Sequence, residues 1–460
     1  MSPVQRKSLS ISTGLALRPA MERRQCLVCA VQQRELARAF FWFLVENYSG
    51  GPMIDKLVDS QGLCVNHKRL LLTPENHWQG NFVCEVLTGY NSRVASEALE
   101  RAEARRRSGS VRFLAGRGGI GRVFGPRADC PFCVHLRSWE RWALTDVVDF
   151  AGDPEVTAAS EYICLPHLLM LIPFTSSEFA LSLAEAVRRR LGVIRAGDEC
   201  DATQAAEFFV ARYPRATRSA FLPAMETELL TDARPPANAA SMKPWPNEVI
   251  ADRSDWERLD WAECVLCQAV RAAEASGVEG EAQSFCRPHA RALLAQAPTA
   301  TTQQLVEWAP RALEQRLAQP HRRRRARNIV RDTACPACQR RCDNTASILA
   351  TVERSDPDRL GRAKFCIPHL PLVLERVSPE SAVAILDAEG ELLRGLHAEL
   401  GEFFRKSDYR FQHEPRGSEQ SAWLRAADIL MGSCLPDTGY DTELEVRRHT
   451  DRQLETRNRR

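Results

Sequence analysis

The sequence predicts an all-α protein that holds four metal ions, each bound by three cysteines and one histidine. Helices are predicted because apolar residues recur at helical spacing after the first two cysteine pairs, and no run alternates between apolar and polar residues as a strand would. After the first pair, the recurring residues are Leu36, Phe40, Phe43 and Leu44. After the second pair, they are Leu136, Trp139, Ala143, Leu144 and Val147.

The third observation is a repeat of paired ligands along the chain. Four Cys-x-x-Cys pairs alternate with four Cys-x-x-His pairs, always in the same order. In chain order, the pairs are Cys26 and Cys29, Cys64 and His67, Cys130 and Cys133, Cys164 and His167, Cys264 and Cys267, Cys286 and His289, Cys335 and Cys338, and Cys366 and His369. A two-residue gap lets both side chains of a pair reach one tetrahedral ion. We expect each Cys-x-x-Cys pair to share its ion with the Cys-x-x-His pair that follows it.

The ligand pairs are expected at or just before helix N-termini, because the helical patterns begin directly after them. The partial positive charge of a helix N-terminus favours thiolate over thiol, which helps three anions to gather around one metal. A further helix is predicted after Ser378, which is a good N-cap, with Pro379 at the first helical position. Its apolar stripe, from Ile385 to Phe403, is expected to face the core.

Zinc is the predicted cofactor, with four ions per chain. The other interpretations are redox dithiols, iron–sulfur clusters and a catalytic zinc. Cys-Pro-Phe-Cys and Cys-Pro-Ala-Cys resemble redox dithiols, but such dithiols would not explain the Cys-x-x-His pairs. Iron–sulfur clusters with the same ligands are the alternative cofactor. Four protein ligands close a zinc site, and the chain carries neither H-E-x-x-H nor a deaminase motif. A structural role for zinc is therefore predicted, with no catalytic residues and no enzyme activity.

The N-terminus and the cysteines predict a protein of the cytoplasm, and the charge balance is not typical of a dedicated nucleic-acid or membrane-surface protein. The 62 basic and 59 acidic side chains give a formal charge of +3, and four zinc sites at −1 each would change this to about −1. The N-terminus lacks the apolar core of a signal peptide, and no stretch approaches the length of a membrane span. Sixteen cysteines in such a chain indicate metal ligands more than disulfides. Of the four cysteines outside the pairs, Cys84, Cys200 and Cys434 are expected to be buried thiols.

The repeat suggests two tandem helical domains with two zinc sites each. The predicted divisions are a flexible N-terminal arm (1–20), a first domain (21–230), a Pro/Ala-rich linker (231–256), a second domain (257–430) and a polar C-terminal tail (431–460). Within them, His135 is an alternative ligand near Cys133, and Cys342 is an alternative near Cys338.

A protein partner, bound by a scaffold that the zinc ions hold in place, is the favoured function. The alternative is a nucleic-acid-binding protein that uses arginine clusters to contact phosphates. Those candidates are Arg105, Arg106, Arg107, Arg322, Arg323, Arg324 and Arg325. Most arginine runs of this kind are solvated helix ends, and aromatic residues are not interleaved with them as in a stacking surface. An iron–sulfur or thiol redox protein is the second alternative.

Several motifs resemble an uncharacterised bacterial family, a domain of unknown function whose members carry C-P-x-C and then G-[FL]-C-x-x-H. The segment Gly62-Leu63-Cys64-Val65-Asn66-His67 is similar to the second motif, and Glu402–Phe411, together with Glu414, Pro415, Glu419 and Trp423, is similar to the tail of that family. The resemblance implies a helical zinc protein and no particular activity. This chain departs from the family by an apparent tandem duplication, with four motifs in place of two, and by lacking an aromatic-rich tail around residues 176–230.

Overall fold

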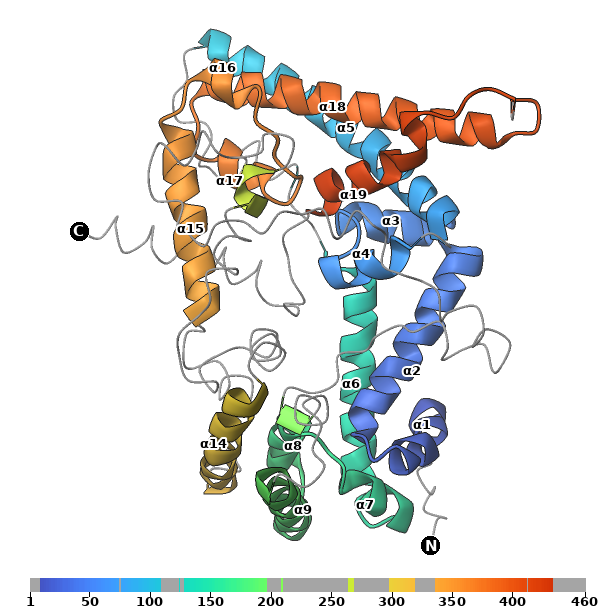
Figure 1. Cartoon of the computed structure of the whole chain (residues 1–460), viewed down its shortest axis with the longest axis vertical. Coiled ribbons are helices and arrows are strands. Elements are labelled where there is room, and N and C mark those ends of the chain that lie inside the picture. The colour runs from blue at the N-terminus through green and yellow to red at the C-terminus, as the bar shows by residue number, and fades with distance from the viewer. Residues whose placement is uncertain are drawn as a thin grey trace, which may run out of the picture. The chain divides into compact units, whose positions relative to one another are not determined.

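The computed structural model describes residues 9–73, 76–108, 124, 128–196, 208–209, 264–268, 298–318, 336–411 and 413–432. Every regular element within these ranges is a helix, so the predicted all-α fold is confirmed (Figure 1). The one β-type pairing that they contain is an isolated bridge between Cys264 and Lys364. None of their helices combines the length and the apolar character that crossing a membrane requires.

The described helices fall into two compact units, and each unit combines segments from both halves of the chain. Unit 1 contains α1 (Ile11–Glu22), most of α2 (Leu27–Trp42) and of α6 (Pro131–Asp149), α7 (Pro154–Ser160), α8 (Leu165–Leu171), η4 (Ile172–Phe174), α9 (Ser177–Ala196) and α14 (Pro298–Ala318). Unit 2 contains η1 (Phe43–Asn47), α3 (Gly51–Asp59), α4 (Val65–Leu71), α5 (His77–Ser108), most of α15 (Pro336–Glu353), α16 (Pro357–Leu360), α17 (Leu370–Leu374), α18 (Pro379–Ser407), η9 (Ser418–Ser421) and α19 (Ala422–Met431). This division differs from the predicted tandem domains, 21–230 and 257–430. The predicted linker, 231–256, lies outside the described residues, as does the predicted tail beyond Gly432.

The predicted N-terminal arm is wrong for residues 11–20, because they form most of α1. Ser10 caps this helix by accepting a hydrogen bond from the backbone N–H of Thr13, and its hydroxyl lies 2.5 Å from the Asp146 carboxylate of α6. The hydroxyl of Ser12 donates to the buried Glu35 carboxylate of α2. Polar contacts of this kind fix a short helix that its modest apolar face would not hold alone.

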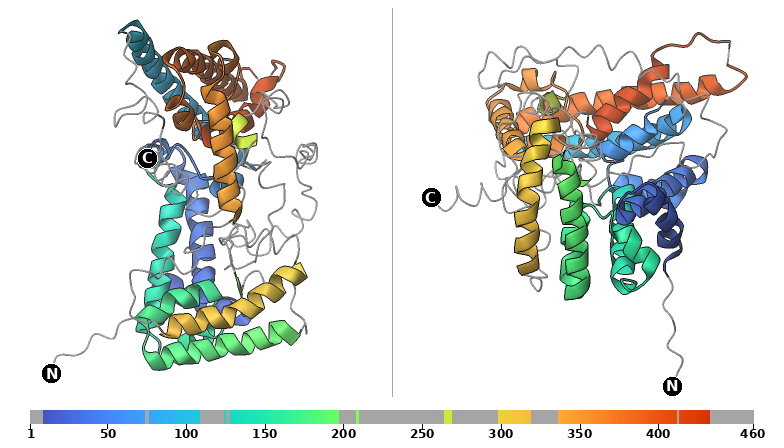
Figure 2. Two further views of the ribbon diagram at one scale, coloured as in Figure 1. Left: turned by 90° about the vertical axis from the view of Figure 1, so that its left-hand side faces the viewer. Right: turned by 60° about the horizontal axis from the view of Figure 1, so that its bottom comes forward.

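In unit 1, α2 and α6 run antiparallel. His135, near the start of α6, is hydrogen-bonded to the backbone of Glu35 in the middle of α2. Farther along α6, Glu140 contacts His167, whose ring also lies beside Cys26 and Cys29 at the start of α2. The two helices therefore point in opposite directions. In the same unit, α9 packs beside α14 (Figure 2).

In unit 2, the core lies between two long helices, α5 and α18, which pack along each other, and α19 covers both. The predicted cap of α18 is confirmed, because the Ser378 side chain accepts from the backbone N–H of Ser381 and Pro379 begins the helix. The predicted core stripe of α18 is buried at most of its positions, namely Ile385, Leu386, Leu393, Leu396, Leu400 and Phe403. Trp423 of α19 packs so closely on Gly80 of α5 that a β-carbon there would lie 2.6 Å from its ring.

Candidate metal centres

Site A is formed by Cys26, Cys29, Cys164 and His167, and all four side chains are buried. The Nδ1 atom of His167 lies 3.3 Å from the Sγ atom of Cys26, 3.5 Å from that of Cys29 and 3.1 Å from that of Cys164. The Sγ atoms of Cys29 and Cys164 are 3.9 Å apart. Three sulfurs and one imidazole nitrogen therefore face a common centre.

Site B is formed by Cys64, His67, Cys130 and Cys133. The Nδ1 atom of His67 lies 3.1 Å from the Sγ atom of Cys64 and 3.5 Å from those of Cys130 and Cys133. The sulfurs of Cys64 and Cys133 are 3.4 Å apart. The Phe132 ring packs against the His67 ring with a centroid distance of 5.5 Å, which gives this site an apolar wall.

Site C is formed by Cys264, Cys267, Cys366 and His369. The Nδ1 atom of His369 lies 3.5 Å from the Sγ atoms of Cys264 and Cys267 and 3.1 Å from that of Cys366. The sulfurs of Cys267 and Cys366 are 3.6 Å apart. The bridge between Cys264 and Lys364 holds the two chain segments together beside the site.

The distances in all three sites fit the edges of a tetrahedron around a single ion. Bonds of about 2.3 Å to sulfur and about 2.1 Å to nitrogen give S···S edges of about 3.8 Å and S···N edges of about 3.6 Å. The nine S···N edges are 3.1–3.5 Å, and one S···S edge in each site measures 3.4–3.9 Å. All four ligand atoms of each site lie within 4.8 Å of one another. Each site can therefore hold one metal ion.

The charges within the sites also call for a cation. In site A, burial acts to raise the pKa of Cys26, but hydrogen bonds with Cys164 and Cys29 and the charge of His167 lower it. The pKa of the Cys29 thiol is raised well above its ordinary value, first by its hydrogen bonds with Cys164 and Cys26 and then by burial. In site C, burial followed by hydrogen bonds with two neighbouring cysteines raises the pKa of Cys366. A divalent cation would supply the charge that three adjacent thiolates need.

Helix N-termini position most of the ligands, as predicted. The helices α2 and α6 begin at the residue after Cys26 and Cys130. Cys64 and Cys164 are the N-cap residues of α4 and α8, so the histidines three positions later lie in the first turn of those helices. Cys366 differs, because a turn follows it and α17 begins only after His369. These placements explain why a two-residue gap brings both members of a pair onto one ion.

The expected pairing of each Cys-x-x-Cys with the next Cys-x-x-His is wrong for all three described sites. The first Cys-x-x-Cys pair meets the second Cys-x-x-His pair in site A, and the second meets the first in site B. The third Cys-x-x-Cys pair meets the fourth Cys-x-x-His pair in site C. For sites A and B, the reason is helix length. The 16 residues of α2 carry the chain about 24 Å away from Cys26 before it turns toward Cys64.

Glu140 is a candidate supporting residue of site A that the sequence did not predict. Its carboxylate oxygen lies 3.0 Å from the Nε2 atom of His167, whose Nδ1 atom faces the sulfurs of site A. A carboxylate that accepts the second ring N–H of a metal-binding histidine fixes its tautomer and raises its basicity. In the sequence, Glu140 is an acidic residue seven positions after Cys133 on the same predicted helix. Its role could be predicted only if the pairing of the ligands were already known.

Most of the remaining predicted residues belong to none of the three sites or lie outside the described part of the chain. Cys286, His289 and Cys335 lie outside the described residues, and so do the side chains of Cys338 and Cys342. Cys84 is buried and belongs to none of the three sites; its thiol donates to the carbonyl oxygen of Trp423 at 3.4 Å, and burial raises the pKa of this thiol to about 12. His135 belongs to none of the three sites. Cys200 and Cys434 lie outside the described residues as well.

The arginine candidates are only partly described. Arg106 and Arg107 are exposed at the C-terminal end of α5, while the Arg105 side chain and residues 322–325 lie outside the described part of the chain. A third run, on α9, contacts unit 1 itself. Arg188 and Arg189 lie within 3.7 Å of the carboxylates of Glu185 and Glu161, and Arg190 donates to the carbonyl of Tyr162. These contacts favour the interpretation of that run as a solvated helix face.

Comparisons with known proteins add no family to this picture. The chain matches no protein-family model, and searches of curated proteins and of solved structures found no similar chain. The resemblance carried by Gly62–His67 and by the segment after Glu402 therefore stays a prediction.

Proposed function

We propose that this protein is a non-catalytic helical scaffold in which zinc ions hold helices in place so that they can bind a protein partner. The observation that carries this proposal is the completeness of the three ligand sets. Each set supplies three thiols and one imidazole at tetrahedral distances. Four protein ligands leave no position for substrate or water, so the metal stabilises the fold and performs no chemistry.

Zinc suits these sites better than an iron–sulfur cluster does. A [2Fe–2S] or [4Fe–4S] cluster distributes its ligands over two or more irons, which separates the ligand atoms. In sites A, B and C, the ligand atoms all lie within 4.8 Å of one another, as a single ion requires. Three cysteines and one histidine are a common ligand set of structural zinc.

Metal analysis of the purified full chain tests the metal part of this proposal. Mass spectrometry of the bound metal should find zinc, with four ions per chain when the predicted ligands outside the described residues are included. The protein should be colourless. Chelation should unfold it, because each structural zinc contributes folding free energy of order 10 kcal/mol. A brown protein that absorbs near 400 nm, or one that stays folded after chelation, would contradict the proposal.

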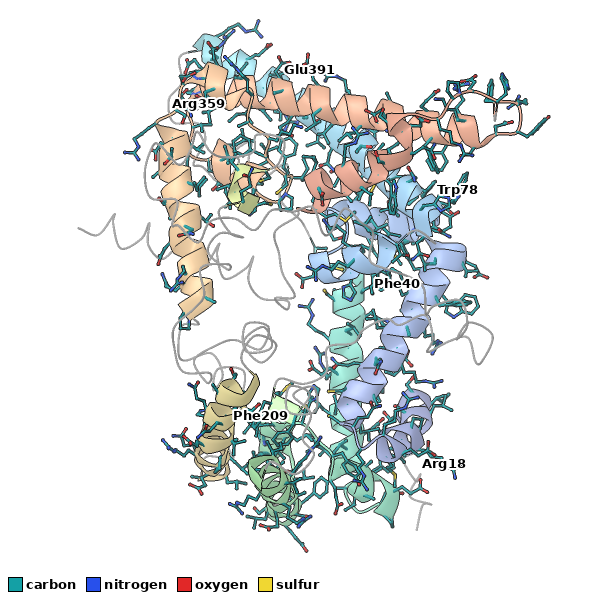
Figure 3. The ribbon with its side chains drawn as sticks, in the orientation of Figure 1. Arg18, Phe40, Trp78, Phe209, Arg359 and Glu391 are labelled. Atoms are coloured by element: carbon teal, nitrogen blue, oxygen red, sulfur yellow. The ribbon has the colours of Figure 1, made fainter. Side chains whose placement is uncertain are left out.

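The end of α18 offers a surface that suits a protein partner. Trp78 of α5 packs edge to face on Phe404 at 4.9 Å, and it remains 40% exposed (Figure 3). Just beyond α18, Tyr409 is 80% exposed. Exposed tryptophan and tyrosine side chains are enriched among the residues that dominate binding energy at protein interfaces.

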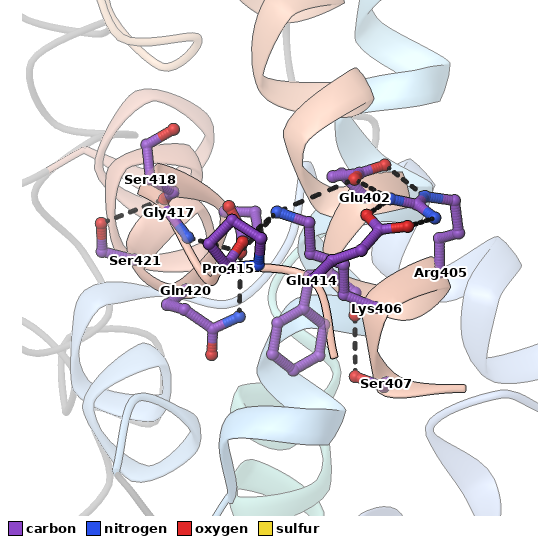
Figure 4. Close-up of polar contacts among 12 residues, drawn as sticks. Glu402, Arg405, Lys406, Ser407, Glu414, Pro415, Gly417, Ser418, Gln420 and Ser421 are labelled. Atoms are coloured by element: carbon purple, nitrogen blue, oxygen red, sulfur yellow. Dashed lines mark hydrogen bonds and ion pairs between the residues drawn. The ribbon is translucent and has the colours of Figure 1, made fainter. Parts of the chain in front are cut away.

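A network of ion pairs fixes the loop that carries Tyr409. Arg405 pairs with Glu402 and Glu414, and Lys406 lies 3.3 Å from the Glu419 carboxylate (Figure 4). The Glu419 carboxylate also accepts the backbone N–H of Gly417 at 2.7 Å. A loop that is already ordered loses less entropy on binding than a flexible one does. This network supports a preformed contact surface.

Photo-crosslinking tests the partner part of the proposal. A photoreactive amino acid at position 409 should crosslink the chain in cells to one discrete protein. The matched control is the same amino acid at Glu391, which is exposed in the middle of α18 (Figure 3). No product at position 409, or the same products at both positions, would contradict the proposal that this surface binds a partner.

A further inference from the structure

The C-terminal end of α19 contacts the chain on both sides of a ligand pair in site B. Lys68, the residue after the ligand His67, is buried, and its Nζ atom donates to the carbonyl oxygen of Gly432 at 2.5 Å and to the Asp428 carboxylate at 3.0 Å. On the other side of the pair, Gly62 packs against Met431, where a β-carbon would lie 3.0 Å from the Met431 side chain. Site B is therefore attached to α19 before Cys64 and after His67.

The same end of α19 contacts site C. The carbonyl oxygen of Ile429 accepts the backbone N–H of Ile367, the residue after Cys366, at 2.7 Å. Gly432 lies against the sulfurs of this site, because a β-carbon built on it would be 3.5 Å from the Sγ atom of Cys366 and 3.8 Å from that of Cys267. Gly432 has φ +72° and ψ 156°, a conformation found almost only in glycine.

We propose that the segment Asp428–Gly432 couples sites B and C, so that metal bound at one site raises the affinity of the other. This inference rests on the proposed function, because it assumes that both sites bind metal. The metal at site B fixes the first turn of α4 and with it Lys68. The fixed Lys68 then holds the Gly432 carbonyl, and Gly432 and Ile429 hold the Cys366 segment in its ligating position.

The charges and burial of the contacts explain why the coupling should be strong. A buried ammonium group needs its acceptors, so Lys68 cannot leave the Gly432 carbonyl and the Asp428 carboxylate without a large cost in free energy. If site B loses its metal and α4 shifts, the end of α19 must shift with Lys68. Lys68 and Gly432 thus act as positioning residues, and neither binds the metal itself.

Thermodynamic linkage requires the coupling between the metal affinities of sites B and C to be equal in both directions. If loss of metal at site B weakens site C by some factor, loss of metal at site C must weaken site B by the same factor. Coupled sites typically show factors of roughly 5 to 150. Site A belongs to the other unit and has none of these contacts, so it provides an internal control for variants of site C.

The test uses the full chain loaded with ¹¹³Cd²⁺, which gives one NMR signal per site. Cys29→Ser, Cys130→Ser and Cys267→Ser assign the signals of sites A, B and C in turn, and titration with a chelator gives the affinity of each site. Cys130→Ser should weaken site C by roughly 5- to 150-fold, and Cys267→Ser should weaken site B by the same factor while leaving site A unchanged. An unchanged affinity at site C in Cys130→Ser overturns the coupling.

Lys68→Met provides a second test that keeps all twelve described ligands. It should shift the ¹¹³Cd signal of site C and weaken cadmium binding there, while the matched variant of an exposed lysine, Lys56→Met, should do neither. An unchanged signal and affinity at site C in Lys68→Met overturns the proposal, even if Cys130→Ser fails to fold. A chain that binds no metal at all would instead contradict the proposed function.

Discussion

The Nε2 atom of His167 lies 3.0 Å from a carboxylate oxygen of Glu140, while the Nδ1 atom of the same ring faces the three sulfurs of site A. When Nδ1 binds a metal ion, the ring proton lies on Nε2, where the Glu140 carboxylate can accept its hydrogen bond. This contact also means that α6 contributes a supporting side chain to site A.

Glu140→Gln should weaken metal binding at site A by about 10- to 100-fold, the usual effect of removing a carboxylate that supports a metal-binding histidine. The amide keeps the size of the side chain but loses the negative charge that favours the Nε2–H tautomer. Chelator competition on the cadmium-loaded chain measures the change site by site. Glu155→Gln, on the exposed first turn of α7, is the control and should leave site A unchanged. Equal affinities in the two variants would contradict the supporting role.

Gly62→Ala should lower the free energy of unfolding by about 1–3 kcal/mol. Gly62 has φ +92°, and a β-carbon would lie 3.0 Å from Met431 and 3.2 Å from Leu87. Backbone strain and overpacking would therefore act together. The control is Gly395→Ala, because that glycine lies within α18 and has open space around it, so alanine should leave stability unchanged or raise it. Urea unfolding of the zinc-loaded chains gives both values, and equal midpoints would contradict the argument.

Much of this fold follows from local sequence signals. Ser378 and Pro379 predict the start of α18, and the paired cysteines predict the starts of α2 and α6, because capping and helix periodicity act within a few residues. The glycine of the Gly62–His67 motif also has a local reason, namely its positive φ.

The pairing of the ligands could not be predicted in the same way. Every Cys-x-x-Cys pair has the same local chemistry, so the spacing around Cys26 and Cys130 fits either Cys-x-x-His pair. Which Cys-x-x-His pair completes each site depends on where the chain emerges from α2 and α6, which have 16 and 19 residues. That position is a property of tertiary packing. The supporting side chains Glu140 and Lys68 depend on that packing as well.

Glu389 predicts a pH dependence of stability. This carboxyl group in α18 is buried and accepts the backbone N–H of Phe365 at 2.6 Å, just before the ligand Cys366. Burial raises its pKa from 4.5 to about 8. Between these values the folded chain keeps the proton and the unfolded chain loses it. This group alone should therefore lower the free energy of unfolding by about 1.4 kcal/mol per pH unit up to about pH 8.

Glu389→Gln removes this dependence while keeping an acceptor for the Phe365 N–H. Its stability relative to the natural chain should rise between pH 6 and pH 8 and then level off. Urea unfolding at pH 6, 7, 8 and 9 in saturating zinc measures the difference, and titration of the metal ligands cancels because both proteins share it. A constant difference across this range would show that the Glu389 carboxyl does not titrate as its burial requires.

Counting metal ions in double variants tests the crosswise pairing itself. Cys26→Ser with Cys164→Ser removes two ligands of site A, so the chain should lose one ion. Cys26→Ser with Cys64→Ser removes one ligand from each of sites A and B, so it should lose two. If each Cys-x-x-Cys pair instead shared its ion with the next Cys-x-x-His pair, the first double variant should lose two ions and the second should lose one. Loss is expected because a site left with two or three ligands binds zinc too weakly to survive dialysis against a chelator.

The crosswise pairing can also be applied to the predicted ligands outside the described residues. It joins Cys335 and Cys338 with Cys286 and His289. Cys286→Ser with Cys335→Ser should then cost one ion, and a loss of two would restrict the crosswise rule to the three described sites.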